Sequence, residues 1–312
     1  MNIRKLLLAL FLLVSFWSKA QLYPVFSQYY FNELVINPAY AGAHVQLSTN
    51  VTFRNQWINF PGAPKTFSFS GHSSLMGGRL GVGLLVNVDK IGSYSNKDIT
   101  PSFAYKLKFP KSTLSFGMQG MIYIVGADFS NLTLKNPDDP GFVPINQVRP
   151  NVGAGIYYNR KNFFVGFSVP YIINSTFNKV NDGVSMALRQ SRYYFLRSGI
   201  IRPLDVKGNV KINPSILIRT QEGQPLSFDL NTAFIFYDVF SAGVSYRSGD
   251  AFISFVSLKV SEKLFFSYSF DLTRSDLSPY SSGTHEFMLN YRQKLTSVHK
   301  NLMCPSFHSY RE

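Results

Sequence analysis

The five histidines are the first residues to consider for catalysis or metal binding, and their spacing favours neither. No two of them form the pair four residues apart that places two imidazoles on one face of a helix. His285 precedes Glu286 at the start of a predicted strand, with no nucleophile motif nearby, so we interpret it as a polar residue of a strand end. A hydrolase that uses His285 with a Ser or Asp stays a remote alternative. The histidines are His44, His72, His285, His299 and His308.

Other residues that could bind a metal or carry a reaction are few. Asp138 and Asp139 could bind Ca²⁺ together with neighbouring carbonyls, but such a pair is more typical of a solvated turn. Cys304 is the single cysteine, which excludes an intramolecular disulfide and a zinc cluster. We therefore predict no enzymatic activity, no catalytic residue, no metal site and no cofactor.

The first twenty residues are typical of a secretory signal peptide. A positively charged start, residues 1–5, precedes an apolar stretch at 6–17, and Ser18 and Ala20 place small residues at the positions that define a cleavage site. The apolar stretch is too short to span a bilayer comfortably, which weighs against the alternative of an N-terminal membrane anchor. We expect the mature chain to begin at Gln21.

The composition excludes disorder and a bundle of membrane helices. Of 312 residues, 45% are hydrophobic and 16% aromatic, and the mean hydropathy is -0.01. No apolar run approaches the roughly 18 residues that a membrane-spanning helix needs. The formal net charge of +14 suggests an anionic partner or surface. Because the basic residues form no run, we expect no nucleic-acid partner.

From residue 44 onward hydrophobicity alternates with a period of two, which is typical of β-strands with one apolar face. Between residues 80 and 88 every even-numbered residue is Leu or Val, whereas the odd-numbered residues from 81 to 89 are Gly, Asn or Asp, with Leu85 as the exception. Many of the predicted strands have about ten residues, enough to cross a bilayer at the tilt of a barrel strand. There are about fourteen of them, at residues 44–57, 65–75, 79–89, 98–109, 112–126, 149–159, 162–170, 191–203, 208–220, 224–237, 239–247, 250–260, 263–273 and 283–294.

The connections between these strands alternate in length, as they do in outer-membrane barrels. Those expected outside the cell are residues 58–64, 90–97, 127–148, 171–190, 221–223, 248–249 and 274–282. Those expected in the periplasm are 76–78, 110–111, 160–161, 204–207, 238 and 261–262. The two longest lie outside, and no periplasmic turn exceeds about four residues. We predict an all-β fold, with residues 44–294 forming an outer-membrane antiparallel β-barrel of about 14 strands.

A soluble β-sandwich or propeller is the alternative fold, since its strands also have one buried face. The membrane barrel is favoured by aromatic residues near strand ends, which suit interfacial girdles, and by basic side chains on the polar faces, which suit a wet lumen. A barrel of this width holds either a basic aqueous path or a plug. The basic residues expected to face the lumen are Arg54, Lys106, Lys211, Arg219, Arg247 and Arg292.

Residues 21–43 precede the first strand and have a different pattern. Phe26, Tyr30 and Leu34 fall four residues apart and predict a short helix that ends before Asn37 and Pro38. Aromatic residues this dense would be costly to leave exposed as one patch, so we expect a periplasmic segment that plugs the barrel or binds a partner. Its candidate residues are Tyr23, Phe26, Tyr29, Tyr30, Phe31, Asn37, Pro38 and Tyr40. Residues 295–312 show no alternation and predict a flexible periplasmic tail.

Three blocks of sequence resemble a known family. Residues 26–33 read FSQYYFNE and are followed by INPAYAG at 36–42. A second block combines RNQW at 54–57 with GAPKT at 62–66, and a weaker third block is HEF at 285–287. Together they resemble the PorP/SprF family of type IX secretion system membrane proteins from Bacteroidetes. The motif residues of the second block are Arg54, Gln56, Trp57, Gly62 and Pro64.

The resemblance implies a non-enzymatic, integral outer-membrane protein that supports export or cell-surface attachment of a secreted protein. That partner would be an adhesin-like cargo with a C-terminal sorting domain, including adhesins used in gliding motility. Further partners implied are periplasmic type IX secretion subunits, expected to contact residues 21–43, and outer-membrane lipid and lipopolysaccharide. The tail after residue 294 is longer than the family pattern. The basic polar faces favour a different alternative, a porin-like diffusion channel for anionic solutes.

Overall fold

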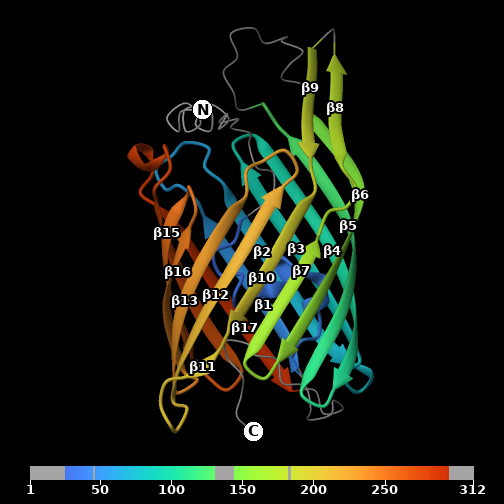
Figure 1. Ribbon diagram of the computed structural model, residues 1–312. Coiled ribbons are helices and arrows are strands. Elements are labelled where there is room, and N and C mark those ends of the chain that lie inside the picture. The colour runs from blue at the N-terminus through green and yellow to red at the C-terminus, as the bar shows by residue number, and fades with distance from the viewer. Residues whose placement is uncertain (1–24, 45, 131–143, 182–183, 295–312) are drawn as a thin grey trace, which may run out of the picture.

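The computed structural model describes residues 25–44, 46–130, 144–181 and 184–294, and it is a closed antiparallel β-barrel (Figure 1). Its main sheet has fifteen strands, of which the two-residue β11 (Arg202–Pro203) is an extension and the other fourteen form the wall. These are β1 (Gln46–Asn55), β2 (Lys65–Leu75), β3 (Leu80–Ile91), β4 (Tyr94–Phe109), β5 (Ser112–Ala127), β6 (Ile145–Arg160), β7 (Phe163–Val169), β10 (Tyr193–Ile200), β12 (Val210–Gln221), β13 (Ser227–Phe236), β14 (Phe240–Arg247), β15 (Ala251–Lys259), β16 (Leu264–Thr273) and β17 (Thr284–Lys294).

The wall is built from neighbours in sequence and closed by its first and last strands. Each wall strand pairs with the next one along the chain, and β1 pairs with β17 over ten residue pairs, from Gln46 opposite Lys294 to Asn55 opposite His285. The fourteen predicted strands and the predicted fold class are confirmed.

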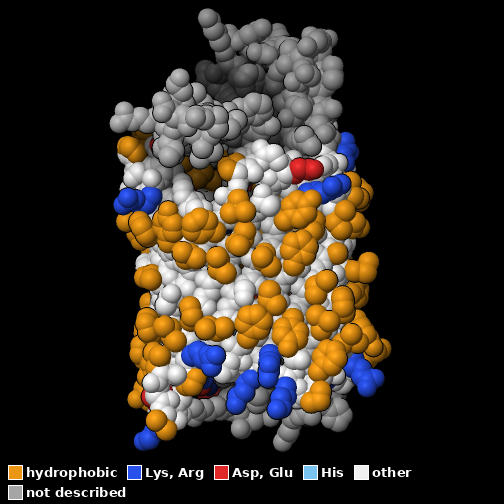
Figure 2. All heavy atoms as spheres, viewed as in Figure 1, with side chains coloured by type: hydrophobic (Ala, Val, Ile, Leu, Met, Phe, Trp, Pro, Cys, Tyr) orange, Lys and Arg blue, Asp and Glu red, His pale blue; other side chains and the backbone are white. Residues whose placement is uncertain are grey.

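Alternation along the strands separates a lumen face from an outer face. In β2 the side chains of Thr66, Ser68 and Ser70 are buried inside the barrel, whereas Phe67 and Phe69 are 45% and 37% exposed on the outside. Figure 2 shows hydrophobic side chains spread over the outer wall, with Lys and Arg side chains toward its two ends. An outer face this apolar suits contact with lipid.

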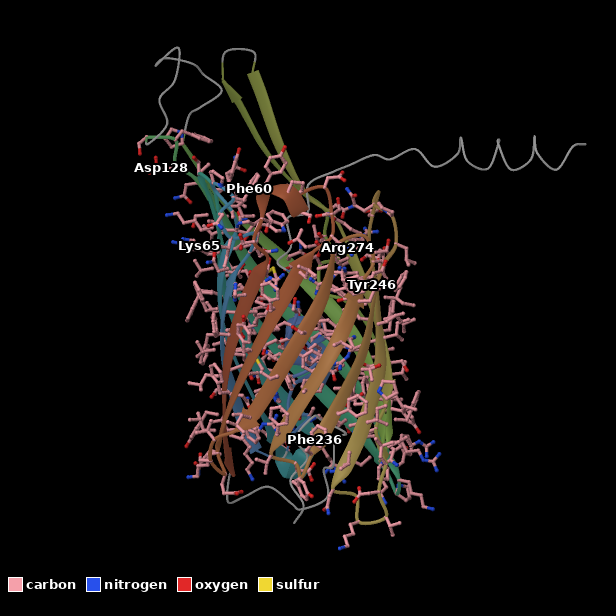
Figure 3. The ribbon with its side chains drawn as sticks, turned by 90° about the vertical axis from the view of Figure 1, so that its left-hand side faces the viewer. Phe60, Lys65, Asp128, Phe236, Tyr246 and Arg274 are labelled. Atoms are coloured by element: carbon pink, nitrogen blue, oxygen red, sulfur yellow. The ribbon has the colours of Figure 1, made fainter. Side chains whose placement is uncertain are left out.

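The two ends of the barrel differ. The end that carries Phe60, Asp128 and Arg274 (Figure 3) holds the longest connections, residues 128–144 and 170–192, and is called the long-loop end. The opposite end, near Phe236, is called the short-turn end. A two-stranded hairpin, β8 (Ser175–Asn181) with β9 (Val184–Gln190), projects beyond the long-loop end (Figure 1).

Some connections differ from the predicted ones. The predicted loop at residues 90–97 is a tight turn at Gly92 and Ser93, because β3 and β4 continue beyond the predicted strand ends. Gly92 has φ 56°, a left-handed conformation that glycine adopts without strain. At the short-turn end the connection between β10 and β12, residues 201–209, is longer than predicted. It includes the short strand β11, which pairs with the start of β12.

The predicted N-terminal helix is wrong. Residues 26–42 contain two 3-10 turns, η1 (Glu33–Val35) and η2 (Pro38–Tyr40), and no α-helix. Pro38 begins η2, and the Asn37 side chain accepts a hydrogen bond from Ala39 N at 2.9 Å. No helix in the described part of the chain is long and apolar enough to span a membrane.

Candidate functional site: the N-terminal segment in the lumen

Residues 26–42, called here the lumen segment, lie inside the barrel, and every one of them is buried (Figure 1). The segment begins near the long-loop end, where Ser27 contacts β16 and β17. It ends near the short-turn end, where Gly42 lies beside β2, β3 and β4. The sequence predicts this segment as a plug of the barrel or as a periplasmic contact for a partner, and the structure places residues 26–42 within the barrel. Whether the segment closes the lumen to solutes stays a prediction.

A buried charge cluster holds the start of the lumen segment. Arg54 on β1 contacts Asp271 on β16 and Glu286 on β17, each at 2.8 Å. The Glu286 carboxylate also accepts hydrogen bonds from the backbone N–H groups of Ser27 and Gln28, at 2.8 and 2.9 Å. Charged hydrogen bonds of this kind are stronger than neutral ones, so this end of the segment is fixed by its backbone.

The charge cluster continues along the wall. Asp229 on β13 contacts Arg247 at 3.2 Å and Arg219 at 3.4 Å, and Arg247 also lies 3.7 Å from Asp271. Arg247 donates a further hydrogen bond to the backbone carbonyl of Phe26 at 3.3 Å. The three arginines, Arg54, Arg219 and Arg247, are matched by three acids, Asp229, Asp271 and Glu286. These six buried side chains have a formal charge of zero, which lowers the cost of burying them. Arg247 also lies 3.5 Å from Asp250, whose side chain is 40% exposed.

A second ion pair holds the middle of the lumen segment. Glu33 lies 2.5 Å from Arg197 of β10, and both side chains are nearly inaccessible to solvent. The Arg197 guanidinium also lies over the rings of Tyr29 and Phe164, at 5.3 and 4.9 Å from their centroids. Cation–π contacts of this geometry add to the attraction of the opposite charge.

The aromatic residues of the segment pack on apolar side chains that interrupt the polar lumen face. Tyr30 lies 4.2 Å from Phe255 of β15, measured between ring centroids, and Phe31 lies edge-on to the same ring at 6.0 Å. Leu85, the exception in the alternation of β3, belongs to this same buried cluster. The apolar exceptions on the lumen face therefore mark where the segment packs.

Glycines on the lumen face leave space for the second half of the segment. A Cβ at Gly117 of β5 would lie 2.1 Å from Ala39 N, and one at Gly155 of β6 would lie 2.2 Å from Asn37 Oδ1. A side chain at Gly117 requires the backbone of the segment to shift, and one at Gly155 requires the Asn37 side chain to move. The same Asn37 side chain donates to the carbonyl of Ile156 at 3.2 Å.

The end of the lumen segment is bound by polar side chains of the wall. Lys106 of β4 donates to the carbonyl of Gly42, and Gly42 N donates to His72 Nδ1 at 3.2 Å. Ser168 of β7 donates to the carbonyl of Ile36 at 2.6 Å. Side chains from β2, β4 and β7 thus satisfy backbone groups of a segment that has little regular structure of its own.

The structure brings most of the predicted site residues together. Phe26, Tyr29, Tyr30, Phe31, Asn37, Pro38 and Tyr40 all lie in the lumen segment, while Tyr23 lies outside the described residues. Of the predicted basic residues, Arg54, Arg219 and Arg247 belong to the charge cluster, and Lys106 and Arg292 are buried elsewhere on the lumen face. Lys211 lies at the short-turn end, 2.6 Å from Asp238.

Other residues singled out in the sequence lie away from the lumen. Gln56, Trp57, Gly62 and Pro64 belong to the β1–β2 connection at the long-loop end, next to Arg54. His285 contacts the hydroxyl of Tyr268 at 2.7 Å on the outer side of the wall. Residues 1–20, Asp138, Asp139, Cys304 and the tail at 295–312 lie outside the described residues.

Sequence reasoning missed the acids that neutralise the lumen. Asp229, Asp271 and Glu286 lie on the polar faces of their strands, so alternation predicts that they point inward. Their pairing with particular arginines has no sequence signal, because Arg54 and Glu286 are 232 positions apart. Arg197 and Glu33 were missed for the same reason. Within the described ranges no group of three or more His, Cys, Asp or Glu side chains is placed to hold a metal ion.

Comparison with known proteins identifies the family. The family model described as "Type IX secretion system membrane protein PorP/SprF" matches residues 18–291. The chain belongs to the PorP/SprF family. As a member of it, the protein is a β-barrel of the outer membrane and a membrane protein of type IX secretion. The match includes the lumen segment and the whole of the wall up to Tyr291 of β17.

Solved structures similar to this PorP/SprF protein are distant in sequence. The CymD monoaromatic hydrocarbon channel is 12% identical, with a TM-score of 0.48, and the match covers 89% of this chain and 95% of that one. A Pseudomonas aeruginosa FadL homologue is 13% identical, with a TM-score of 0.47, and the match covers 88% and 95%. Among curated proteins no sequence matches the chain.

Proposed function

We propose that this PorP/SprF protein is a non-enzymatic component of type IX secretion that supports export or cell-surface attachment of a secreted protein. The cargo would be adhesin-like and carry a C-terminal sorting domain. The observation that carries the proposal, beside the family match, is that the lumen is occupied by the protein's own chain. A partner is therefore held at the ends of the barrel and does not pass through it.

The long-loop end is the surface that we propose for the secreted partner. Outer-membrane barrels place their long connections outside the cell, and here the longest ones, residues 128–144 and 170–192, share this end with the projecting β8–β9 hairpin. A barrel with long connections at one end is suited to holding a protein at the cell surface.

The short-turn end is the surface that we propose for periplasmic secretion subunits. Contact through residues 21–43 was expected from the sequence, but residues 26–42 are buried in the lumen. Exposed basic side chains in and beside the short turns, among them Lys111, Lys161 and Lys207, offer an acidic partner complementary charge instead.

The test compares where the secreted proteins accumulate. In cells that lack the protein, we would restore either the native chain or a variant in which a Gly-Ser linker replaces Ser175–Gln190, the β8–β9 hairpin. Loss of attachment moves cargo from the cell surface to the medium, whereas loss of export leaves it in the periplasm. Mass spectrometry of the three fractions separates the two roles.

The matched control replaces residues 204–206 at the short-turn end with Gly and Ser, which leaves Lys207 in place, and outer-membrane levels of each variant are measured by immunoblotting. An unchanged cargo distribution in the hairpin variant, at normal barrel levels, would contradict the proposed place of attachment. The alternative, a diffusion channel for anionic solutes, is not favoured, because the three arginines of the charge cluster are paired with acids and the lumen segment is buried among the lumen side chains.

A further inference from the structure

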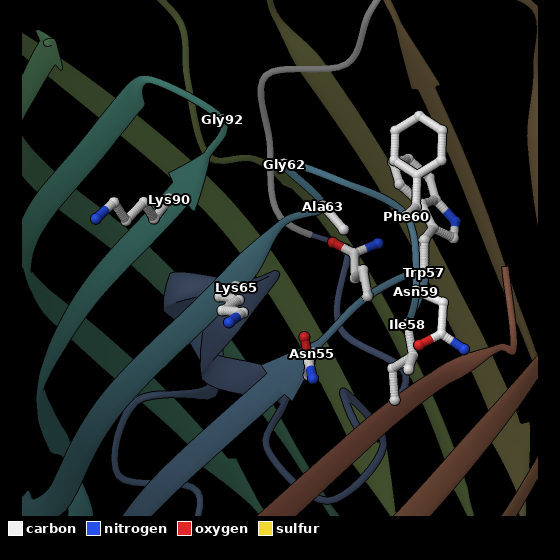
Figure 4. Close-up of a pocket in the computed structure, with 11 residues that line it drawn as sticks. Asn55, Trp57, Ile58, Asn59, Phe60, Gly62, Ala63, Lys65, Lys90 and Gly92 are labelled. Carbon is white, nitrogen blue, oxygen red and sulfur yellow. The ribbon is translucent and has the colours of Figure 1, made fainter. Parts of the chain in front are cut away.

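A cavity of about 450 Å³ lies at the long-loop end, between the β1–β2 connection and the turn that joins β3 to β4 (Figure 4). It is separate from the lumen segment and from the charge cluster. Its walls combine two aromatic side chains with amides and two lysines. The polar and aromatic residues that line it are Asn55, Gln56, Trp57, Asn59, Phe60, Lys65 and Lys90.

The loop that forms the cavity is held in a defined conformation. Trp57 has a φ angle of 43°, in the left-handed region that residues with bulky side chains rarely adopt, and Asn59, a residue type that adopts this region more readily, has a φ angle of 72°. The neighbouring strands fix this backbone, since Ile58 N donates to the carbonyl of Gly283 at 2.9 Å and Trp57 N donates to Thr284 Oγ1 at 3.1 Å. Strain that the surroundings maintain in this way is typical of binding sites.

The two lysines place two positive charges side by side. Hydrogen bonds from Ser130 lower the pKa of the Asp128 carboxyl, and the nearby charge of Lys90 contributes to the lowering. Lys65 and Lys90 are directly opposite each other in the β2–β3 pair, and both are exposed. Like charges at opposed positions destabilise a sheet. Neither ammonium lies within 4 Å of a carboxylate in the part of the chain that the structure describes. An anionic ligand would remove this repulsion.

The lysines lie on the outer face of the wall, at the edge of its apolar surface. Thr66 and Asp89 are the sequence neighbours of Lys65 and Lys90, and their side chains face the lumen. There the Thr66 hydroxyl donates a hydrogen bond to the Asp89 carboxylate at 2.5 Å. The next outward position on β2 is Phe67, which is 45% exposed. With the long loops outside the cell, we expect the two ammonium groups to lie near the lipid headgroups of the outer leaflet.

The aromatic and amide side chains indicate a sugar. The rings of Trp57 and Phe60 lie edge-to-face, 6.5 Å apart between centroids, so an aromatic face is available for the apolar face of a pyranose ring. Asn55 and Gln56 offer amide donors and acceptors for hydroxyl groups. Lysine ammonium groups bind phosphates and carboxylates as point charges. These groups together match a sugar that carries an anionic substituent.

We propose that this cavity binds the phosphorylated or carboxylated sugar headgroup of an outer-leaflet glycolipid. The proposal depends on the outer-membrane location and not on the role in secretion. Lys65 and Lys90 bind the anionic substituent, and Trp57 packs against the sugar ring. The bound lipid fixes the β1–β2 connection at the membrane surface.

Trp57 makes the cavity directly observable. The sequence contains two tryptophans, Trp17 and Trp57, so a chain that begins at residue 21 has Trp57 as its sole tryptophan. We would titrate this folded full-length mature barrel in detergent with bisphosphorylated lipid A and follow Trp57 emission, with native mass spectrometry as an independent measure. We expect saturable binding and a change in emission, and at least tenfold weaker binding for the double variant Lys65→Gln/Lys90→Gln.

One control variant and three other ligands test whether the binding depends on the two lysines and on the lipid phosphates. Lys111→Gln/Lys161→Gln removes the same charge from the short-turn end and should bind lipid A as the native protein does. If fully dephosphorylated lipid A binds as tightly as the bisphosphorylated form, the proposal is overturned. It is also overturned if the Lys65→Gln/Lys90→Gln variant binds lipid A with unchanged affinity while its gel mobility shows a folded barrel. Binding of free glucosamine 1-phosphate or of an acidic peptide, without binding of lipid A, would assign the cavity to a soluble anion or to a protein partner and would also overturn it.

Discussion

Arg54 and Glu286 face each other across the pair formed by the first and last strands of the barrel, and their side chains meet at 2.8 Å. The same Glu286 carboxylate accepts the backbone N–H groups of Ser27 and Gln28. One carboxylate therefore links closure of the wall to the position of the lumen segment. Changes at this residue should affect both.

Replacing Glu286 with Gln should destabilise the barrel by about 3 kcal/mol, because removal of one partner leaves Arg54 buried with less compensation. The free energy of unfolding in urea, followed by gel mobility of the folded form, measures the effect. Glu262→Gln is the control, since Glu262 pairs with Lys259 but its side chain is 83% exposed; its effect should stay below about 1 kcal/mol. Similar losses in the two variants would show that the buried contact has no special role.

A second prediction concerns the space that β5 leaves for the lumen segment. Gly117→Ala should cost about 1–3 kcal/mol, because the new Cβ would lie 2.1 Å from Ala39 N and the segment must shift. Gly120→Ala on the same strand meets nothing within 4 Å and should change the stability by less than about 1 kcal/mol.

The measurement combines unfolding in urea with labelling of a cysteine placed at the half-buried Ala43, which packs against the cluster that contains Ala39, in a Cys304→Ser background. Gly117→Ala should increase the labelling rate and Gly120→Ala should not. Equal rates in the two glycine variants would indicate that the segment is not held by this close approach.

Alternation predicts the wall because an outer face in contact with lipid must be apolar at every second residue. That constraint acts within each strand, so β2 is predicted with its observed ends, from Lys65 to Leu75. The lumen follows no such local rule. Leu85 and Phe255 interrupt the polar face because they pack on the lumen segment, and their partners are distant in sequence.

The lumen segment itself shows how tertiary contacts override local pattern. The spacing of Phe26, Tyr30 and Leu34 is typical of a helix, yet all sides of the segment meet the wall. Glu286 satisfies two of its backbone N–H groups and Pro38 limits the remaining helical stretch. Helical hydrogen bonds are replaced by contacts that only the closed barrel can supply.

A third prediction concerns conductance. In planar bilayers the native protein should show little or no steady conductance, whereas deletion of residues 26–36 should open a wide pore. The pore should prefer anions, because the deletion removes Glu33 and leaves Arg197 without that partner. Adding Arg197→Gln to the deletion should reduce the preference. A large, anion-selective conductance of the native protein would instead support the diffusion-channel alternative.

A fourth prediction concerns the ion pair between Glu33 and Arg197. Its contribution to stability can be measured without changing the charge cluster. Arg197→Met and Glu33→Gln should each destabilise the protein by about 2–4 kcal/mol, because each leaves a buried charged side chain without the opposite charge. The double variant should cost less than the sum, with a coupling energy of about 1–3 kcal/mol. The matched cycle uses Lys259 and Glu262, which lie 2.8 Å apart at the surface, and should give a coupling below about 1 kcal/mol. Equal coupling in the two cycles would mean that burial does not strengthen the lumen pair, and that aromatic packing alone holds the middle of the segment.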